Sequence, residues 1–231
     1  MDRRAKRDLM AGLMLLAAFG LWTALIRRVD VRPIGPNGTS VGFAAFNGWF
    51  HRLTGVHMAL YAITDWLGLV PIAVCLGFAA LGAVQLARRR SLARVDGDIL
   101  LLGAYYVLVI LCYLLFEMVP INYRPILIDG ALEASYPSST TLLVLSVMPT
   151  LGFQAGRRFA DARLRRAVAA CSAAFSAFMV LGRLVAGVHW ATDIVGAALL
   201  SAGLFAIYRF AVALTDAGKR GDSGRRDRGI R

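Results

Sequence analysis

Long uncharged apolar stretches constrain this chain more than any other feature of its sequence. Four of them contain no formal charge: residues 9–26, 66–87, 99–116 and 138–156. Each approaches the roughly 20 residues that an α-helix needs to cross a bilayer core about 30 Å thick. Backbone at that depth finds no water, and a helix satisfies its own hydrogen bonds. The four stretches therefore predict membrane-spanning helices.

Two further apolar stretches, residues 167–187 and 190–208, contain one ionisable residue each, Arg183 and Asp193. With them the chain is predicted to be all-α, a single polytopic membrane domain of six transmembrane helices over residues 1–215. Of the 231 residues, 58% are hydrophobic and only 17% are charged, which is unlike a soluble domain. The formal charge of +12 falls in short breaks between apolar runs, so no nucleic-acid partner is expected.

Most of the 26 lysine and arginine residues fall on one side of this six-span arrangement. The positive-inside rule then places both termini in the cytoplasm and the alternate connections outside. An arginine-rich, lysine-poor chain of this kind indicates a bacterial inner membrane. The basic tail, residues 216–231, is predicted to be disordered. Aromatic residues in the long outward segment 27–65 predict either a helix on the membrane surface or a cap on the bundle.

A histidine and an aspartate stand where the fifth predicted span gives way to the sixth. His189 and Asp193 are four residues apart, and on a helix this spacing lets the carboxylate accept the imidazole N–H. Such a pair fixes the tautomer and leaves the other ring nitrogen as a nucleophile. Arg183 precedes the histidine across Gly187, which permits a turn. Singly, the aspartate fits a helix cap and the arginine a snorkelling side chain. Together, three such groups are costly in a membrane unless they are used.

A second outward segment supplies more anion-binding groups. Arg124 follows the third predicted span, and Ser138, Ser139 and Thr140 open the fourth after a proline. Hydroxyl residues at this place predict a helix N-terminus, whose free N–H groups bind anions. We therefore expect a phosphate site formed by these four residues and Arg183. No histidine, cysteine or carboxylate spacing typical of a metal or cofactor site is present, so neither is expected.

Residues 182–196 resemble the signature S-R-x-x-x-G-x-H-x-x-x-D-x-x-G of the type 2 phosphatidic acid phosphatase superfamily, with Gly182 in place of the leading serine. The resemblance implies a six-span bundle and a histidine that attacks phosphorus to form a phosphohistidine. It makes His189 the nucleophile, Asp193 the group that orients it, and Arg183 a phosphate ligand.

Two other family signatures match in part. Arg124 and the following proline fit K-x-x-x-x-x-x-R-P, with Glu117 at the lysine position. Ser138 and the preceding proline fit P-S-G-H, with Ser139 and Thr140 at the glycine and histidine positions. In the family that histidine protonates the leaving oxygen. An aliphatic hydroxyl is far too weak an acid for this task, so the general acid is missing or lies elsewhere.

Several explanations of this difference are open. Glu117, Asp129 or Glu133 serves as the acid, or the substrate has a good leaving group such as a diphosphate, or the chain binds phospholipid without turnover. The exchange of lysine for Glu117 also raises the alternative of a ligand with a cationic head such as ethanolamine or choline.

The expected function is a metal-independent membrane lipid phosphatase that hydrolyses a phosphomonoester or diphosphate lipid at an outward-facing site. The alternatives are a lipid phosphotransferase, in which an alcohol replaces water, and a non-catalytic phospholipid-binding membrane protein. A transporter is less consistent with the sequence, because the embedded charges cluster at the outward ends and no internal repeat is present.

Overall fold

The computed structural model describes the backbone of residues 2–228 and the side chains as far as residue 218. This part of the chain is helical, with isolated β-bridges and no strand, as the sequence predicts. The helices are α1 (Arg3–Ile26), α2 (Ala44–Thr54), α3 (Met58–Leu67), α4 (Leu69–Arg89), α5 (Gly97–Met118), α6 (Ser139–Arg158), α7 (Ala162–Val185) and α8 (Ala191–Arg228), with short 3₁₀ turns at Pro36–Gly38 and Leu92–Arg94.

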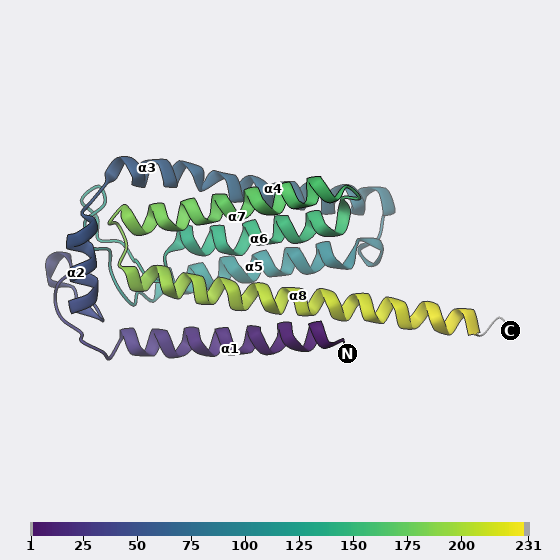
Figure 1. Cartoon of the computed structure of the whole chain (residues 1–231), viewed down its shortest axis with the longest axis horizontal. Helices are drawn as coiled ribbons and strands as arrows, with labels where there is room; N and C mark the ends of the chain where they lie inside the picture. Colours follow the sequence, from purple (N-terminus) through teal and green to yellow (C-terminus); the bar gives the residue numbers. More distant parts are fainter. Residues whose placement is uncertain (1, 229–231) are drawn as a thin grey trace.

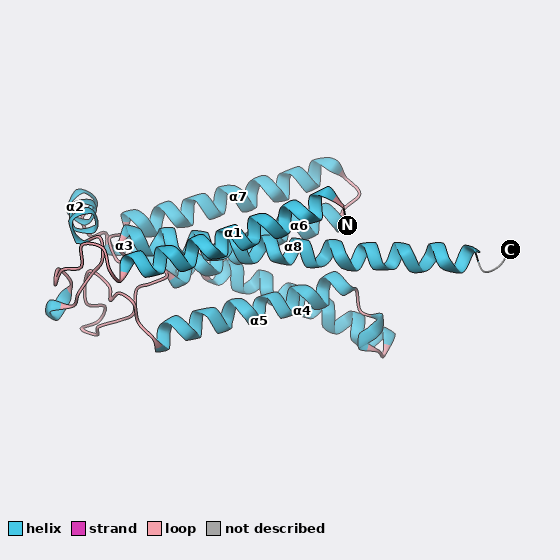
Figure 2. Cartoon of the chain, turned by 90° about the horizontal axis from the view of Figure 1, so that it is seen from below, coloured by secondary structure: helices cyan, strands magenta, loops and turns pink. Residues whose placement is uncertain are grey.

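The long helices form a bundle with the longest connections at one end and both termini toward the other. Figure 1 shows α1 and α3 to α8 running side by side, while α2 crosses one end of the bundle. Both chain ends lie toward the other end. Figure 2 shows the longest connections gathered beside α2, so segments far apart in the sequence meet there. The orientation of the two ends relative to the cytoplasm stays a prediction.

Five segments are long and apolar enough to cross a membrane: Arg3–Ile26, Met58–Arg89, Gly97–Met118, Ala162–Val185 and Ala191–Gly218. Large apolar side chains such as Met14, Leu76 and Leu111 are exposed along them, as expected for helices solvated by lipid. The protein is a multi-pass membrane protein. The remaining predicted span, the fourth at residues 138–156, corresponds to α6, which does not reach the hydropathy of the other five, so the count of six is approximate.

The polarity of α6 follows from its place inside the bundle. Its Thr150 and Gln154 side chains are buried and have partners on neighbouring helices. The Tyr106 hydroxyl lies 2.7 Å from the Thr150 hydroxyl, and the Gln154 amide donates to the Tyr208 hydroxyl over 2.6 Å. Internal partners allow polar side chains in a helix that lipid does not contact.

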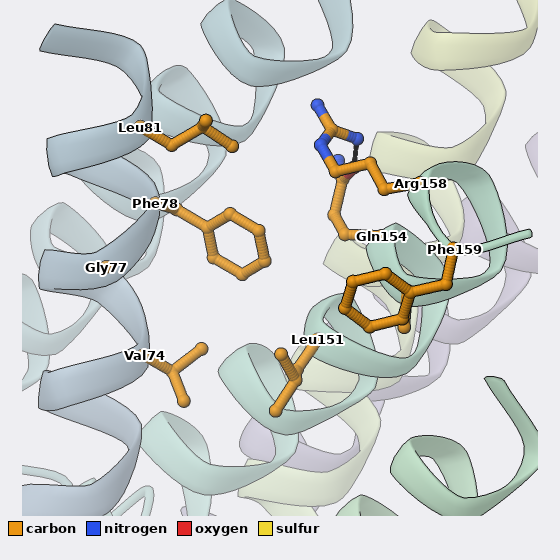
Figure 3. A pocket seen from close by; sticks show the side chains of 9 residues that line it. Val74, Gly77, Phe78, Leu81, Leu151, Gln154, Arg158 and Phe159 are labelled. Atoms are coloured by element: carbon orange, nitrogen blue, oxygen red, sulfur yellow. Dashed lines mark hydrogen bonds between the residues drawn. The ribbon is translucent and has the colours of Figure 1, made fainter. Parts of the chain in front are cut away.

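Ion pairs tie the helices together at the end that carries the termini. Asp98 of α5 accepts hydrogen bonds from Arg157 and Arg158 of α6, at 3.1 and 2.9 Å. Beside them, α4 and α6 enclose an apolar cavity of about 340 Å³ with Gln154 and Arg158 at its edge. Figure 3 shows Phe78 of α4 facing α6 across this space. The lining residues include no nucleophile and no catalytic acid.

Two further regions can be compared with the sequence predictions. The structure continues α8 to Arg228, where a disordered tail is predicted for residues 216–231. Residues 229–231 lie outside the described part. The outward segment contains α2, whose Phe46 and Trp49 are exposed. Whether α2 touches a membrane surface stays a prediction.

Candidate active site

A turn at Gly187 connects the C-terminus of α7 to the N-terminus of α8, on the side of the bundle where α2 lies. Gly187 has φ +70°, a value that strongly favours glycine. A Cβ atom at this position would lie 2.0 Å from the carbonyl oxygen of Gly55, between α2 and α3. The turn therefore fits only without a side chain. It places Arg183 in the last turn of α7 and His189 just before α8 begins.

A serine connects the histidine to the aspartate. His189 precedes the first residue of α8, so the direct pair predicted from helical spacing does not form. Instead, the Ser135 hydroxyl lies 3.0 Å from Nδ1 of His189 and donates to Oδ2 of Asp193 over 2.5 Å. All three side chains are buried. The orienting role expected of Asp193 passes through Ser135, which the sequence analysis did not single out.

This chain of hydrogen bonds defines the tautomer of the histidine. An ionised Asp193 only accepts, so the single proton of the Ser135 hydroxyl points toward it. The serine oxygen then accepts the N–H of His189 Nδ1, and Nε2 is left with a lone pair. Nε2 is buried and has no hydrogen-bond partner. Burial, reinforced by the charges of Arg124 and Arg183, holds the pKa of His189 well below its usual value of 6.5, which favours the neutral, nucleophilic form.

The Asp193 carboxylate has further donors that fix its position. The Trp190 backbone N–H donates to Oδ2 over 2.9 Å, so Asp193 also caps the start of α8. The Asn122 side chain donates to Oδ1 over 3.2 Å. Ser135 is held in turn by its N–H, which donates to the Asn122 carbonyl over 2.9 Å. The Tyr136 ring packs where a Cβ atom on Gly196 would meet it at 2.4 Å, so the glycine allows this loop to approach α8.

Arg183 carries two free donors in the interior of the site. Its side chain is 1% exposed, and its Nη2 donates to Asp65 Oδ1 over 2.8 Å and to the Thr140 hydroxyl. Its Nε and Nη1 are buried without a hydrogen-bond partner. The guanidinium lies 4.8 Å above the Tyr61 ring. Nε and Nη1 point to different sides of the guanidinium, so each is a separate charged donor for an oxyanion.

Arg124 faces the same aromatic ring from the loop after α5. Its guanidinium lies 5.9 Å from the centre of the Tyr61 ring. Its Nε is 3.0 Å from Oε2 of Glu133, although this ion pair lacks hydrogen-bond geometry, and its Nη1 is also without a partner. Tyr61 of α3 thus contacts both arginines and holds two like charges near each other.

The three hydroxyl residues at the start of α6 differ in their roles. The Ser138 hydroxyl is fully buried; it caps the helix by accepting the Thr141 backbone N–H over 3.5 Å, and it donates to the Thr141 hydroxyl over 3.0 Å. It is therefore engaged internally rather than free for a ligand. Ser139 and Thr140 have backbone N–H groups without an acceptor among the described residues. N–H groups of this kind at a helix N-terminus favour an anion, and the anion site at Ser139 and Thr140 stays a prediction.

Two cavities meet at Ser139. A polar cavity of about 220 Å³ is lined by Arg124, Glu133 and Ser135 among others. A second cavity of about 290 Å³ has Asp65 and Thr140 in its lining, with mostly apolar residues elsewhere. The described residues contain no group of three or more histidine, cysteine, aspartate or glutamate side chains placed to hold a metal ion.

Sequence reasoning missed four residues of this site: Ser135, Asn122, Asp65 and Tyr61. Only Asp65 had a usable signal, because it is the sole charged residue between Arg52 and Arg88, and an ionisable residue within an apolar span indicates function. Gly182, which replaces the family serine, also has a structural reason. A Cβ atom there would meet Thr64 Cγ2 at 2.7 Å.

Comparison with known proteins identifies a family and a fold. The sequence model of the PAP2 superfamily matches residues 104–215, a range that contains Arg124, Arg183, His189 and Asp193. Residues 104–215 belong to the PAP2 superfamily. Its fold is similar to the crystal structure of a transmembrane PAP2-type phosphatidylglycerolphosphate phosphatase from Bacillus subtilis, with a TM-score of 0.63 and 15% identity over 86% of this chain and 94% of that one. No curated protein matches the chain.

The range matched by the family model contains the residues on one side of the site, and the residues on the other side lie outside it. Ser135 and Ser139 lie inside the matched range, whereas Asp65 and Tyr61 belong to α3, outside it. The contacts of α3 with Arg183 are therefore read from the structure alone.

Proposed function

We propose that the protein is a membrane lipid phosphatase that forms a phosphohistidine on His189. One observation carries this proposal. Five buried polar atoms without hydrogen-bond partners belong to Arg124, Arg183 and His189. Buried donors and acceptors are normally satisfied, so unsatisfied groups require an explanation. A tetrahedral phosphate bound by the guanidinium groups and approached by Nε2 satisfies all three side chains.

The reaction proceeds in two steps. The Nε2 lone pair of His189 attacks phosphorus, the P–N bond forms, and the P–O bond to the lipid breaks with its electron pair on the leaving oxygen. The imidazole becomes cationic, and Ser135 transmits the charge of Asp193 to its Nδ1–H. Water then attacks the same phosphorus and the P–N bond breaks, releasing phosphate and neutral His189. Arg124 and Arg183 stabilise the charge that develops on the phosphoryl oxygens.

The leaving oxygen needs a proton, and Thr140 is unable to supply it. Its hydroxyl accepts a hydrogen bond from Arg183 Nη2, the same nitrogen that donates to Asp65. Asp65 is therefore the carboxyl group next to the position of the family's acid. We assign it as the acid of the first step and the base of the second. A phosphate that takes the place of Asp65 on Arg183 releases this carboxylate, whose side chain is 59% exposed, to take up a proton from solvent. The carboxyl group then gives that proton to the leaving oxygen, and the resulting carboxylate accepts a proton from the attacking water. Of the three carboxylates predicted for this role, Glu117 and Glu133 line the cavity beside Arg124, whereas Asp129 lines neither cavity.

The second cavity supports a lipid substrate. It has Asp65 and Thr140 in its lining together with aliphatic side chains of α4, α5 and α6, among them Ile72, Val109 and Leu143. An acyl or prenyl chain along these side chains would leave its phosphate beside Arg183. The Bacillus subtilis protein of similar fold is described as a phosphatidylglycerolphosphate phosphatase, and a phospholipid monoester is the first substrate class to test.

The test is to trap and locate a phosphate label. Purified protein is mixed with ³²P-labelled phosphatidic acid, phosphatidylglycerolphosphate or a prenyl diphosphate and quenched at alkaline pH, where phosphohistidine survives. We expect an alkali-stable label on His189 and release of phosphate. The variant His189→Ala should show neither, while His57→Ala, which changes an exposed histidine, should behave as wild type. Turnover by His189→Ala, or no label and no phosphate from any of these lipids, would remove the proposal.

A further inference from the structure

The cavity beside Arg124 combines an arginine with two carboxylates and aromatic rings. Its lining includes Glu117, Glu133, Tyr113, Phe116 and Tyr136. The rings form a packed wall, because Phe116 meets Tyr136 edge-on at 5.8 Å between ring centres. Tyr136 is 1% exposed and stacks on Phe19, so it supports the wall from behind, and Tyr113, which is 39% exposed, is the ring open to a ligand. Aromatic faces beside a carboxylate are a typical site for an ammonium group.

The charges at the site do not suit a phosphate dianion alone. Arg183 is already paired with Asp65 at 2.8 Å, and Arg124 with Glu133 at 3.0 Å. Glu117, at the end of α5, forms no ion pair within the described side chains. It adds an uncompensated negative charge to the cavity that holds Arg124. A second anion would be repelled there, whereas a ligand that brings its own cation would be attracted.

Arg124 supplies the cavity with a hydrogen-bond donor for an oxyanion. Arg124 is 7% exposed, and its buried Nη1 lacks a partner. The cavity thus offers a donor for an oxyanion and, in the same lining, a free carboxylate for a cation. A volume of about 220 Å³ accommodates a small headgroup.

We propose that this cavity binds the ammonium group of a zwitterionic lipid phosphate, with Glu117 as its counter-charge and the phosphate on Arg124 and Arg183. The proposal rests on the phosphate site of the proposed function. The ammonium group belongs either to an ethanolamine or choline ester of the phosphate or to an amino group on the lipid backbone close to a phosphomonoester. Both place a cation a few bonds from phosphorus, beside the aromatic wall.

Binding to the His189→Ala variant tests the headgroup separately from turnover. The probes are dihexanoyl phosphatidylethanolamine, dihexanoyl phosphatidic acid and a short-chain 2-amino-alkanol phosphate, titrated calorimetrically below their micelle concentrations. We expect one or both amine-bearing probes to bind about tenfold more tightly than phosphatidic acid, as one ion pair with aromatic contacts contributes about 1.4 kcal/mol. Which amine probe binds more tightly distinguishes the two sources of the cation.

Substitutions at Glu117 and at a matched carboxylate complete the test. In the His189→Ala background, Glu117→Gln should abolish the preference and Glu117→Lys should reverse it in favour of phosphatidic acid. Asp129→Asn is the control, because Asp129 is exposed on the same loop region, lines neither cavity and has φ 49°, which asparagine tolerates. It should keep the preference.

Two results would overturn the inference: equal binding of all three probes, or the same loss of preference in Asp129→Asn as in Glu117→Gln. Failure of the proposed function is distinguishable from this. A headgroup preference without any label on His189 would remove the phosphatase and keep the headgroup site. A label on His189 without a preference would do the opposite.

Discussion

Replacing Ser135 with alanine breaks the link between Asp193 and His189 without touching the proposed phosphate ligands. The serine hydroxyl makes both hydrogen bonds of this link, at 2.5 and 3.0 Å. Hydrogen bonds to charged groups contribute about 1.5–3 kcal/mol each, and the imidazole is cationic only after attack on phosphorus. We therefore expect Ser135→Ala to lose about 2–4 kcal/mol of transition-state stabilisation, which at about 1.4 kcal/mol per factor of ten is roughly a 30- to 1000-fold fall in kcat.

The assay is single-turnover labelling of His189 together with steady-state phosphate release from phosphatidic acid. The labelling rate and kcat should fall by similar factors, with KM nearly unchanged, because the phosphate ligands remain. Ser146→Ala is the matched control, since Ser146 is a buried serine of α6 whose hydroxyl has no partner. Thermal unfolding in detergent identifies any loss of folded protein. A kcat of Ser135→Ala within about threefold of the Ser146→Ala value, or a loss confined to KM, would refute the reasoning.

Three further predictions follow from the same contacts. The pKa of His189 is lowered by burial and nearby arginines. In a profile of kcat/KM against pH, the loss of activity caused by protonation of His189 should therefore occur below pH 6.5, as the pH falls through the lowered pKa. A loss of this kind centred at or above pH 6.5 would contradict the prediction. Asp65→Asn should slow the hydrolysis of alkyl phosphates about 100-fold and that of p-nitrophenyl phosphate far less, because p-nitrophenolate leaves without a proton. An equal loss of rate on both substrates would mean that Asp65 acts only as the ion-pair partner of Arg183. Gly187→Ala should destabilise the protein by more than the roughly 1–2 kcal/mol that left-handed backbone costs an alanine, because its Cβ atom would also meet the Gly55 carbonyl oxygen. Gly38→Ala is the control, since Gly38 has φ +75° and open space around it, and it should cost no more than that amount. Equal shifts of the two unfolding temperatures in detergent would rule out the Gly55 contact as the reason.

The helical membrane fold was predictable because hydropathy is a local property. Long uncharged stretches determine where helices cross a bilayer, whatever their neighbours are. The helix predicted at residues 138–156 is present as α6, but its hydropathy is lower than that of the other spans because Thr150 and Gln154 are polar side chains, whose partners are Tyr106 and Tyr208. Those partners belong to other helices, and a window of neighbouring residues contains no information about them.

The residues of the site also fall into two groups, those that the sequence identifies and those that only the packing of helices brings together. Arg183, His189 and Asp193 could be named from the sequence because one short segment contains all of them, and the glycine between them permits the turn. Their connection was predicted wrongly, since an i, i+4 pair needs a continuous helix and α8 begins only after His189.

By itself, then, the sequence determined the class of fold and the residues of one segment that carry the nucleophile. The tertiary structure alone decided that Ser135 lies between His189 and Asp193, that Asp65 binds Arg183, and that Glu117 has no ion-pair partner among the side chains described, up to residue 218. The first two contacts join residues 54 and 118 positions apart in the chain. Such contacts depend on how separate helices pack, and no local pattern of residues specifies which distant side chain will fill the space beside a buried charge.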